Sequence, residues 1–215
     1  MSLIDKTLSA VASLYALLTG DPYRRRHRAK YLVFSSAGDR HNIETWVACS
    51  SERNFDLVIY YYGDNDCPAV DADLIVKRKG FKFENFSHFL EHNDIGLYRS
   101  IWVVDDDIIM DTSSINQMFR IFNEYELWLA QPSFDHDSFA PHVITRNNPN
   151  CVLRYTNFIE NGVSLFSTDI IPKLTDSFKA ARTGFGVDYI WTSLLGFPQN
   201  RIAIIDDVVC HHPKS

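Results

Sequence analysis

From Lys30 onward, the chain alternates short apolar runs with polar breaks and segments of helical periodicity. Continuous apolar runs that end in polar residues are typical of strands buried on both faces of a parallel sheet. Three such strands are predicted, at 30–39, 55–64 and 100–108. Apolar residues at helical spacing predict helices at 41–52, 83–93 and 113–125, with Ser113 or Ser114 as the N-cap of the last.

The later half of the chain is more irregular. Apolar stretches predict strands at 127–135, 157–167 and 201–212. Longer pieces join them, including the polar loop 142–151. We therefore expect one α/β domain over residues 30–215, with a mixed, mostly parallel central sheet flanked by helices.

Residues 1–29 are expected to form a separate segment, a helix followed by basic residues. Apolar side chains recur at helical spacing in this segment, at Leu3, Leu8, Val11, Leu14 and Leu18, and the stretch YRRRHRAK follows. Such a helix could lie on an anionic membrane surface; the commoner alternative is a helix packed on its own domain. The apolar run is too short to span a membrane, and Asp5 and Lys6 argue against a signal peptide. The predicted location is cytoplasmic, with peripheral contact at the inner face of the membrane as an option.

Composition narrows the class of protein. The chain has 215 residues, of which 46% are hydrophobic and 22% charged, so it can bury a globular core and is not expected to be disordered. Its net charge of -6 argues against nucleic-acid binding, which requires a cationic surface. The four cysteines are scattered without a C-x-x-C pair and are predicted to be reduced thiols.

The stretch YRSIWVVDDDIIMD, at 98–111, places three carboxylates inside an otherwise apolar segment. Burying a carboxylate without a partner costs several kcal/mol, so a positive group is expected beside Asp105, Asp106 and Asp107, unless they form a solvated turn. In an extended segment Asp105 and Asp107 would share one side, and Asp106 would face the other. Oxygen ligands favour Mg²⁺ or Mn²⁺, which take the rest of their shell from water and substrate phosphates. A phosphate-bearing substrate is therefore predicted.

A hydrophobic strand that ends in D-x-D resembles the mark of the GT-A group of nucleotide-sugar-dependent glycosyltransferases. The segment TGFGVDYIWTSLLG, at 183–196, looks like the G-x-G-x-D segment of an uncharacterised GT-A family. The segment IAIIDDVVCHHP, at 202–213, looks like that family's closing strand, which ends in histidine. The resemblance covers roughly residues 30–213. It implies a GT-A-like, Rossmann-like domain that uses Mn²⁺ or Mg²⁺ to move a sugar from a nucleotide-diphosphate sugar to a saccharide or other hydroxyl acceptor.

The resemblance also assigns roles to the acidic motif and the final histidine. Asp105 would face the ribose or the water shell of the metal, and Asp107 would ligate the metal. Asp106 would act less directly. His212 would be a third metal ligand, although the neighbouring His211 leaves that assignment open by one position.

The same resemblance implies donor and acceptor positions elsewhere. Asp188 would be the catalytic base or an acceptor-orienting carboxylate, or else the N-cap of the helix that follows it. The nucleotide-sugar side would also include Ser35, Ser36, Asp39, Asp64, Lys79 and Lys82. The acceptor side would include Glu160, Asn161, Phe185, Gly186 and Trp191.

Two other functions fit parts of the pattern. A phosphatase of the haloacid dehalogenase type also uses D-x-D at a strand end, with Asp105 as nucleophile, Asp107 as acid/base and a later acidic pair such as Asp206 and Asp207. That family normally carries the motif on its first strand, whereas at least two strands precede it here. The chain could also be a nucleotide-sugar-binding module without turnover. If the fold is GT-A-like, with or without turnover, the strand ends at Ser35, Gly63, Asp105 and His212 are expected to converge on one cleft.

Overall fold

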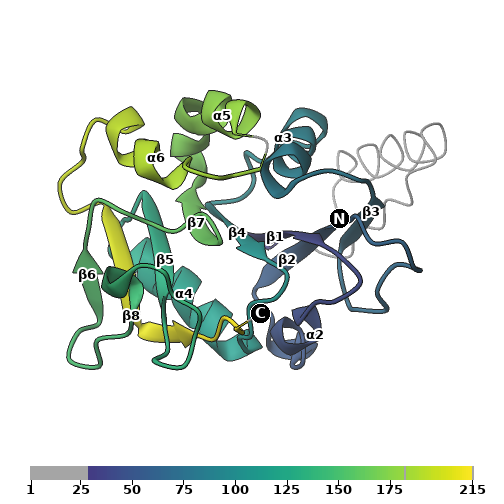
Figure 1. The fold of residues 1–215 in the computed structure, drawn as a ribbon, viewed down its shortest axis with the longest axis horizontal. Coiled ribbons are helices and arrows are strands. Elements are labelled where there is room, and N and C mark those ends of the chain that lie inside the picture. Colours follow the sequence, from purple (N-terminus) through teal and green to yellow (C-terminus); the bar gives the residue numbers. More distant parts are fainter. Residues whose placement is uncertain (1–28, 182, 215) are drawn as a thin grey trace, which may run out of the picture.

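The computed structural model describes residues 29–181 and 183–214. The sheet has eight strands in the order β3-β2-β1-β4-β7-β5-β8-β6. Figure 1 shows it running through the middle of the molecule. In chain order the strands are β1 Tyr31–Ala37, β2 Phe55–Tyr61, β3 Leu74–Lys77, β4 Ser100–Asp105, β5 Leu129–Phe134, β6 Leu153–Tyr155, β7 Val163–Ser167 and β8 Ile202–Cys210.

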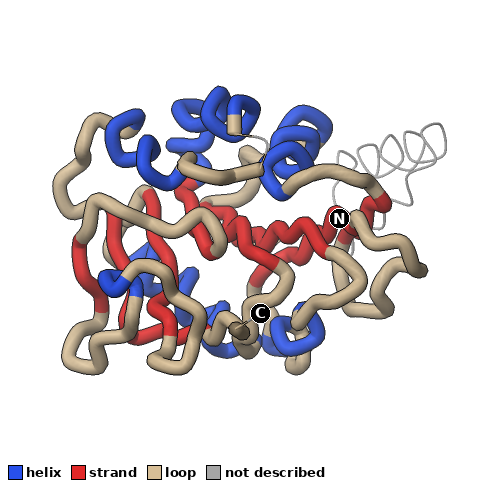
Figure 2. Tube along the Cα trace, viewed as in Figure 1, coloured by secondary structure: helices blue, strands red, loops and turns tan. Residues whose placement is uncertain are grey.

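Helices cover both faces of this sheet, as Figures 1 and 2 show. They are α2 Ile43–Trp46, α3 Lys82–His92, α4 Thr112–Glu124, α5 Ile171–Ala180 and α6 Asp188–Leu194. Apolar residues of α2 and α4 pack in one buried cluster with one face of the sheet. Apolar residues of α3, α5 and α6 pack in a second cluster on the other face. The result is a three-layer α/β/α domain.

The strand directions confirm the prediction of a mixed, mostly parallel sheet. Strand β1 pairs in parallel with β2 and β4, and β5 pairs in parallel with β8. Strand β7 runs antiparallel to both β4 and β5, and β6 runs antiparallel to β8. Since β7 is reversed, the loop that precedes it lies at the edge where β1 and β4 end.

Some elements differ from the sequence-based prediction. The helix expected at 41–52 is a single turn, α2, followed by a 3-10 turn at Ser50–Glu52. It ends where the indole of Trp46 donates to the carbonyl of Ile108 (2.8 Å) and the hydroxyl of Thr112 donates to the carbonyl of Trp46 (2.8 Å). These tertiary hydrogen bonds take the place of further helical turns. Strands β3 and β6 and helix α5 were not predicted.

The predicted N-terminal helix lies outside the described residues, and its membrane contact stays a prediction. Within 29–181 and 183–214, no helix is both long and apolar enough to cross a membrane. The four cysteines, Cys49, Cys67, Cys151 and Cys210, are all unpaired.

The N-cap of α4 is Asp111, and the prediction of Ser113 or Ser114 was wrong. The Asp111 carboxylate accepts hydrogen bonds from the backbone N–H of Ser114 (2.7 Å) and from the hydroxyl of Ser113 (2.8 Å). These bonds lower the pKa of Asp111, with the Ser114 N–H as the largest cause.

Replacing Asp111 by alanine is expected to reduce the free energy of unfolding by about 1 kcal/mol, the usual effect of losing an N-cap. Because the folded pKa lies below the unfolded value, this stabilisation is present above the unfolded pKa and is lost as the pH falls through the folded one. Urea unfolding at neutral and acidic pH measures both effects. Ser113→Ala, the control, should change stability by less than about 0.5 kcal/mol; an equal loss would contradict the assignment of the cap.

Candidate functional site

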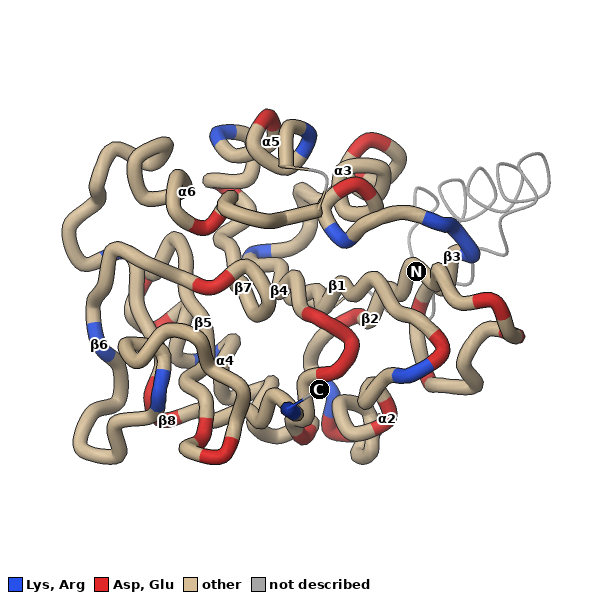
Figure 3. Tube along the Cα trace, in the orientation of Figure 1, with Lys and Arg blue, Asp and Glu red and all other residues tan. Residues whose placement is uncertain are grey.

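The three consecutive aspartates lie where β4 ends, in the middle of the molecule as viewed in Figure 3. The register pairs Asp105 with Ser36 at the end of β1, and the next loop holds Gly38. The backbone of Ile109 forms two hydrogen bonds with that of His211, just after β8 (2.9 and 3.0 Å). These contacts bring the ends of β1, β4 and β8 together, as predicted for an open α/β sheet.

Each aspartate side chain contacts a different part of the chain. Strand β4 ends at Asp105, and the next two residues form a turn, so the alternation expected for an extended segment does not extend to Asp107. The turn is held by Asn42, whose backbone N–H donates to the carbonyl of Asp106 (2.7 Å) and whose side chain donates to the carbonyl of Asp107 (2.6 Å). The direction of each carboxylate is therefore set by this turn.

Asp105 is paired with Lys82, the first residue of α3. The ammonium lies 2.6 Å from Oδ1 of Asp105 and also donates to the carbonyl of Asn161 (2.7 Å). The Lys82 side chain is nearly buried, whereas the Asp105 side chain is partly exposed. Lys82 is thus one of the positive groups that the acidic motif led us to expect.

Asp106 faces the backbone of the loop after β1. Its Oδ2 accepts a hydrogen bond from the N–H of Gly38 (2.7 Å). The pKa of Asp106 is raised to about 6, chiefly by burial and also by the charges of Asp105 and Asp107, while the Gly38 bond acts to lower it. A side chain at Gly38 would meet the ring of Tyr62 at 2.9 Å, so this loop needs glycine. Asp106 therefore connects two loops.

Asp107 faces His212, with Oδ2 and Nε2 3.3 Å apart. Nδ1 of His212 lies 3.0 Å from the carbonyl oxygen of Phe139, which can only accept, so Nδ1 carries a proton and the remaining position on Nε2 points at the carboxylate. A lone pair on Nε2 would face the negative charge of the Asp107 carboxylate. The arrangement therefore favours either a proton on Nε2 or a cation between Nε2 and the carboxylate. Accordingly, the Asp107 carboxylate raises the pKa of His212, and the hydrogen bond from His212 lowers that of Asp107.

His211 is directed elsewhere. Its Nδ1 lies 2.9 Å from Oδ2 of Asp135, on the loop after β5. The backbone pairing with Ile109 keeps the segment at His211 extended. Because consecutive side chains point to opposite sides of an extended segment, His212 points away from His211 and toward Asp107. Of the two histidines left open by the sequence, His212 is the one beside the acidic motif.

The other oxygen of Asp107, Oδ1, is buried and has no hydrogen-bond partner among the described residues. A buried carboxylate oxygen without a partner is costly and matches a position for a ligand. Within the same residues, no group of three or more His, Cys, Asp and Glu side chains is arranged to hold a metal ion. Mg²⁺ and Mn²⁺ need only one or two protein ligands when substrate phosphates and water complete the shell. Asp107 and His212 fit that smaller set.

A second group of predicted residues lies on the loop before β7 and at the start of α6. The amide of Asn161 donates to Oδ2 of Asp188 (3.2 Å) and to the carbonyl of Gly184 (3.0 Å). Asp188 is 8% exposed, and its Oδ1 has no partner among the described residues. The N-cap of α6 is Val187, and Asp188 makes no capping hydrogen bond, so the alternative role as an N-cap was wrong.

Glu160 precedes this pair. One carboxyl oxygen lies 2.8 Å from the hydroxyl of Thr145, and its backbone N–H donates to Oε1 of Gln131 (2.8 Å). Burial raises the pKa of Glu160, which favours the protonated form more than in an exposed glutamate. The two glycines beside Asp188, Gly184 and Gly186, have φ of 78° and 80°, a backbone conformation that favours glycine.

The structure does not bring every predicted residue to this site. Ser35 is fully buried and donates its hydroxyl to the carbonyl of Val104 (2.9 Å). Trp191 is fully buried against Phe166 and Phe178, so it belongs to the core. Neither side chain has a surface that a ligand could touch, which corrects their assignment. Ser35 lies on a strand that is buried on both faces, and Trp191 lies on the buried side of α6; the sequence shows the residue types but not this burial.

The remaining predicted residues lie around the site or at its rim. Ser36 is nearly buried and accepts a hydrogen bond from the amide of Asn85 (2.7 Å). The carboxylate of Asp39 already accepts hydrogen bonds from the hydroxyl of Tyr61 and the backbone N–H of Asp64. Lys79 and Asp64 form an exposed ion pair (2.5 Å). Phe185 is 92% exposed. The contribution of these side chains stays a prediction.

No family model matches the chain, and no curated protein matches it in sequence. Solved structures do match. The TarS 1–349 structure from S. aureus in complex with UDP-GlcNAc aligns with a TM-score of 0.57 at 13% identity, over 86% of this chain and 58% of that chain. GalNAc-T7 with UDP, GalNAc and Mn²⁺ aligns with a TM-score of 0.61 at 7% identity, over 85% of this chain and 43% of that chain. The fold is GT-A-like.

The likeness to these nucleotide-sugar glycosyltransferases concerns the fold. The chain spans less than two thirds of the length of the TarS 1–349 and GalNAc-T7 chains. Within the GT-A-like sheet, the acidic motif follows β4, the fourth strand along the chain, whereas the phosphatase alternative expects it on the first. Of the later acidic pair that the phosphatase would use, Asp206 is buried and paired with Arg154. Only the exposed Asp207 is left as a candidate for that role.

Proposed function

We propose that this chain is a metal-dependent glycosyltransferase that moves a sugar from a nucleotide-diphosphate sugar to a hydroxyl acceptor. The observation that carries the proposal is the pair Asp107 and His212, at the edge of the sheet where the strands end. Oδ1 of Asp107, which has no partner in the part of the chain that the structure describes, and Nε2 of His212 offer two ligand atoms. The pair lies beside Asp105 and Lys82. Proteins of similar fold were solved with UDP-GlcNAc and with UDP and Mn²⁺, which supports this class of donor.

The proposed reaction divides the work between the two groups of side chains. Asp107 and His212 would hold Mn²⁺ or Mg²⁺, which stabilises the charge that develops on the leaving diphosphate. Lys82 supplies a nearby fixed positive charge for the same phosphates. Asp105 would contact the ribose or the water around the metal. Ser36, Asp39 and Asp64 are assigned to the nucleotide.

The acceptor would bind on the opposite side of Lys82. Asp188 would accept the proton of the acceptor hydroxyl or orient that hydroxyl, since its Oδ1 has no hydrogen-bond partner within 29–181 and 183–214. Asn161 holds the other oxygen of Asp188 in place. Glu160 lies next to Asn161 and would contact the same acceptor.

Asp107→Asn is expected to weaken manganese-dependent UDP binding by about tenfold or more, because the amide keeps the shape of the side chain but loses its charge. Titration calorimetry with UDP, with and without Mn²⁺, measures the effect. Asp106→Asn is the matched control, since Asp106 contacts the Gly38 backbone and not His212. Equal losses from the two variants would contradict the assignment of Asp107 as the ligand. UDP binding without hydrolysis or transfer of any UDP-sugar would favour a binding module without turnover.

A further inference from the structure

Three rings from three separate segments meet beside the proposed acceptor carboxylates. The ring of His142 lies 4.5 Å from that of Phe158, and the ring of Tyr189 lies 5.4 Å from Phe158 and 6.1 Å from His142, measured between centroids. The hydroxyl of Tyr189 is 3.5 Å from Nε2 of His142. We refer to His142, Phe158 and Tyr189 as the ring cluster.

The ring cluster is not part of the hydrophobic core. None of its members belongs to either buried apolar cluster. Tyr189 is 65% exposed, whereas Trp191, two residues further along the same helix, is fully buried. An aromatic ring that stays in water does not gain the free energy of burial. Packing of the core therefore does not explain why Tyr189 is aromatic.

Hydrogen bonds connect the ring cluster to the acceptor carboxyl groups. The hydroxyl of Thr145 lies 2.7 Å from the carbonyl oxygen of His142 and 2.8 Å from Oε1 of Glu160. Tyr189 directly follows Asp188, and the helix that carries both is held to the loop of Phe158 by the hydroxyl of Thr192, which donates to the carbonyl of Asn157 (2.6 Å). The charges of His142 and Asp188 both act on the pKa of Glu160, as expected for neighbours.

Aromatic side chains next to a few fixed polar groups are the usual lining of a small-ligand subsite. In the ring cluster Tyr189 is exposed, and His142 and Phe158 are half-buried. The apolar face of a sugar ring can lie on an aromatic side chain, while its hydroxyls need acceptors at the edge of that ring. Here the carboxyl groups of Glu160 and Asp188 provide acceptors. Asp188 directly precedes Tyr189, and its buried Oδ1 has no hydrogen-bond partner among the described residues. The Tyr189 ring supplies the apolar surface.

We propose that the ring cluster is the acceptor subsite and that the acceptor is a saccharide, whose ring packs on Tyr189 and whose hydroxyls reach Glu160 and Asp188. The role of this subsite in binding the acceptor rests on the proposed function. The binding of a saccharide at these rings stands on the geometry of the ring cluster alone. A lipid or polypeptide acceptor would reach Asp188 without needing a flat ring beside it.

The test uses the full chain and a panel of methyl glycosides of common hexoses and N-acetylhexosamines, with glycerol as a polyol without a ring. Saturation-transfer NMR reports which compounds bind, and titration gives their affinity. At least one glycoside should bind while glycerol does not. Tyr189→Ala should weaken that glycoside about tenfold, the scale of one lost aromatic contact. Tyr189→Phe should retain most of the affinity because it keeps the ring. Tyr125→Ala, at an aromatic residue 39% exposed beyond the end of α4, is the control and should leave binding unchanged.

Each outcome separates this inference from the proposed function. Absence of glycoside binding across the panel, or binding that Tyr189→Ala leaves unchanged, overturns the saccharide subsite even if UDP still binds with Mn²⁺. Glycoside binding that depends on Tyr189 in a protein that does not bind UDP supports the subsite and contradicts the proposed function. A Tyr189→Ala variant that sediments as a smaller species, with glycoside signals unchanged, would show that the ring covers a second copy of the chain and would also overturn the inference. Melting temperature and circular dichroism confirm that each variant is folded.

Discussion

Replacing Asp188 by asparagine is expected to lower transfer to an acceptor by about 10²-fold or more, the usual scale for loss of a positioned general base. Donor binding should change little, because the donor is assigned to Asp107, His212 and the loops after β1 and β4. The fold should be retained, since the amide oxygen of asparagine can still accept the hydrogen bond from Asn161. Donor affinity, melting temperature and turnover are to be measured on the same variant.

Asp176→Asn is a suitable control for Asp188→Asn because Asp176 is exposed on α5. It should be silent in all three measurements. Because Asp188 makes no capping hydrogen bond, a reduced turnover cannot be attributed to loss of a helix cap. Full turnover by Asp188→Asn with an unchanged melting temperature would remove Asp188 from the catalytic role and would direct attention to Glu160.

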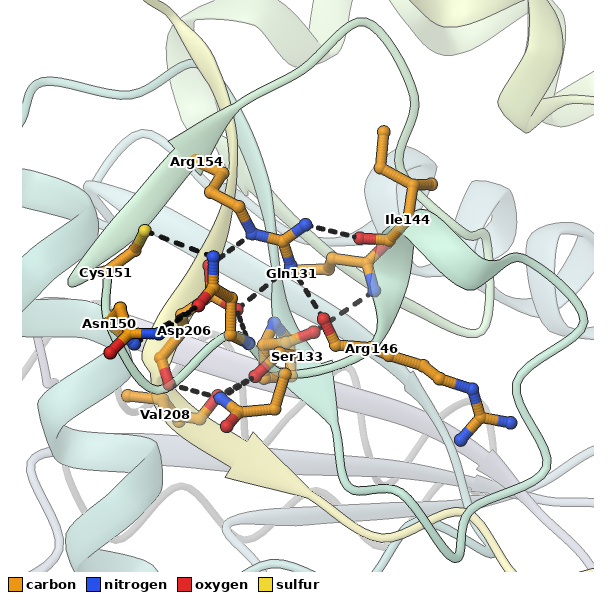
Figure 4. A network of polar contacts seen from close by, with 12 residues as sticks. Gln131, Ser133, Ile144, Arg146, Asn150, Cys151, Arg154, Asp206 and Val208 are labelled. Carbon is orange, nitrogen blue, oxygen red and sulfur yellow. Dashed lines mark hydrogen bonds and ion pairs between the residues drawn. The ribbon is translucent and has the colours of Figure 1, made fainter.

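The largest expected effect on stability is that of Asp206→Ala, a loss of about 3–5 kcal/mol in the free energy of unfolding, as for other buried ion pairs that lose one partner. Figure 4 shows the network around Asp206. Its carboxylate has no exposed surface and accepts hydrogen bonds from Nε of Arg154 (2.7 Å), from a second Arg154 nitrogen (3.0 Å) and from the backbone of Asn148 (2.8 Å). Alanine would leave the guanidinium without its counter-charge.

The neighbouring acidic residue provides the control for this change. Asp207 is exposed and accepts one hydrogen bond, from the side chain of Gln117 (3.2 Å), so Asp207→Ala should change stability by less than about 0.5 kcal/mol. Urea unfolding followed by circular dichroism measures both variants. Equal and small effects would contradict the view that the Arg154 pair holds this corner of the sheet.

Arg154 also connects the Asp206 network to the loop that carries His142. Its guanidinium donates to the carbonyls of Ile144 (2.9 Å) and Arg146 (2.7 Å), on either side of Thr145. Thr145 is in turn the residue that contacts both His142 and Glu160. Asp206→Ala is therefore expected to loosen the loop that carries His142 as well as to destabilise the sheet.

The central strands of this sheet are predictable from the sequence because they are buried on both faces. Strands β1, β2 and β4 are mostly apolar in sequence for that reason. Strand β6, with three residues that include Arg154, lies at the sheet edge and has no such pattern. It becomes a strand only because β8 is available to pair with it, and that partner is distant in sequence.

The candidate site shows the same division. The acidic motif and His212 can be identified because they follow apolar strands, and strand ends are where such folds collect ligands. The contacts that decide their roles depend on segments far apart in the chain. Lys82 meets Asp105 across 23 residues, and His212 meets Asp107 across 105 residues. The ring cluster has no sequence signal of its own, because its three residues are spaced irregularly along the chain.

The reversed direction of β7 has a consequence for how this fold can diversify. The loops proposed to hold the donor follow strands that point toward the binding edge, whereas the loop with Glu160 and Asn161 precedes a strand that points away from it. The two sides of the rim are therefore built from connections that share no residues. They meet through Lys82 and through the backbone N–H of Asp105, which donates to the carbonyl of Gly162 (2.8 Å). Insertions or substitutions in one set of connections can alter the choice of one substrate without shifting the strand that orients the other. Under the proposed function, selectivity for donor and for acceptor would be inherited, and changed by evolution, as separate traits.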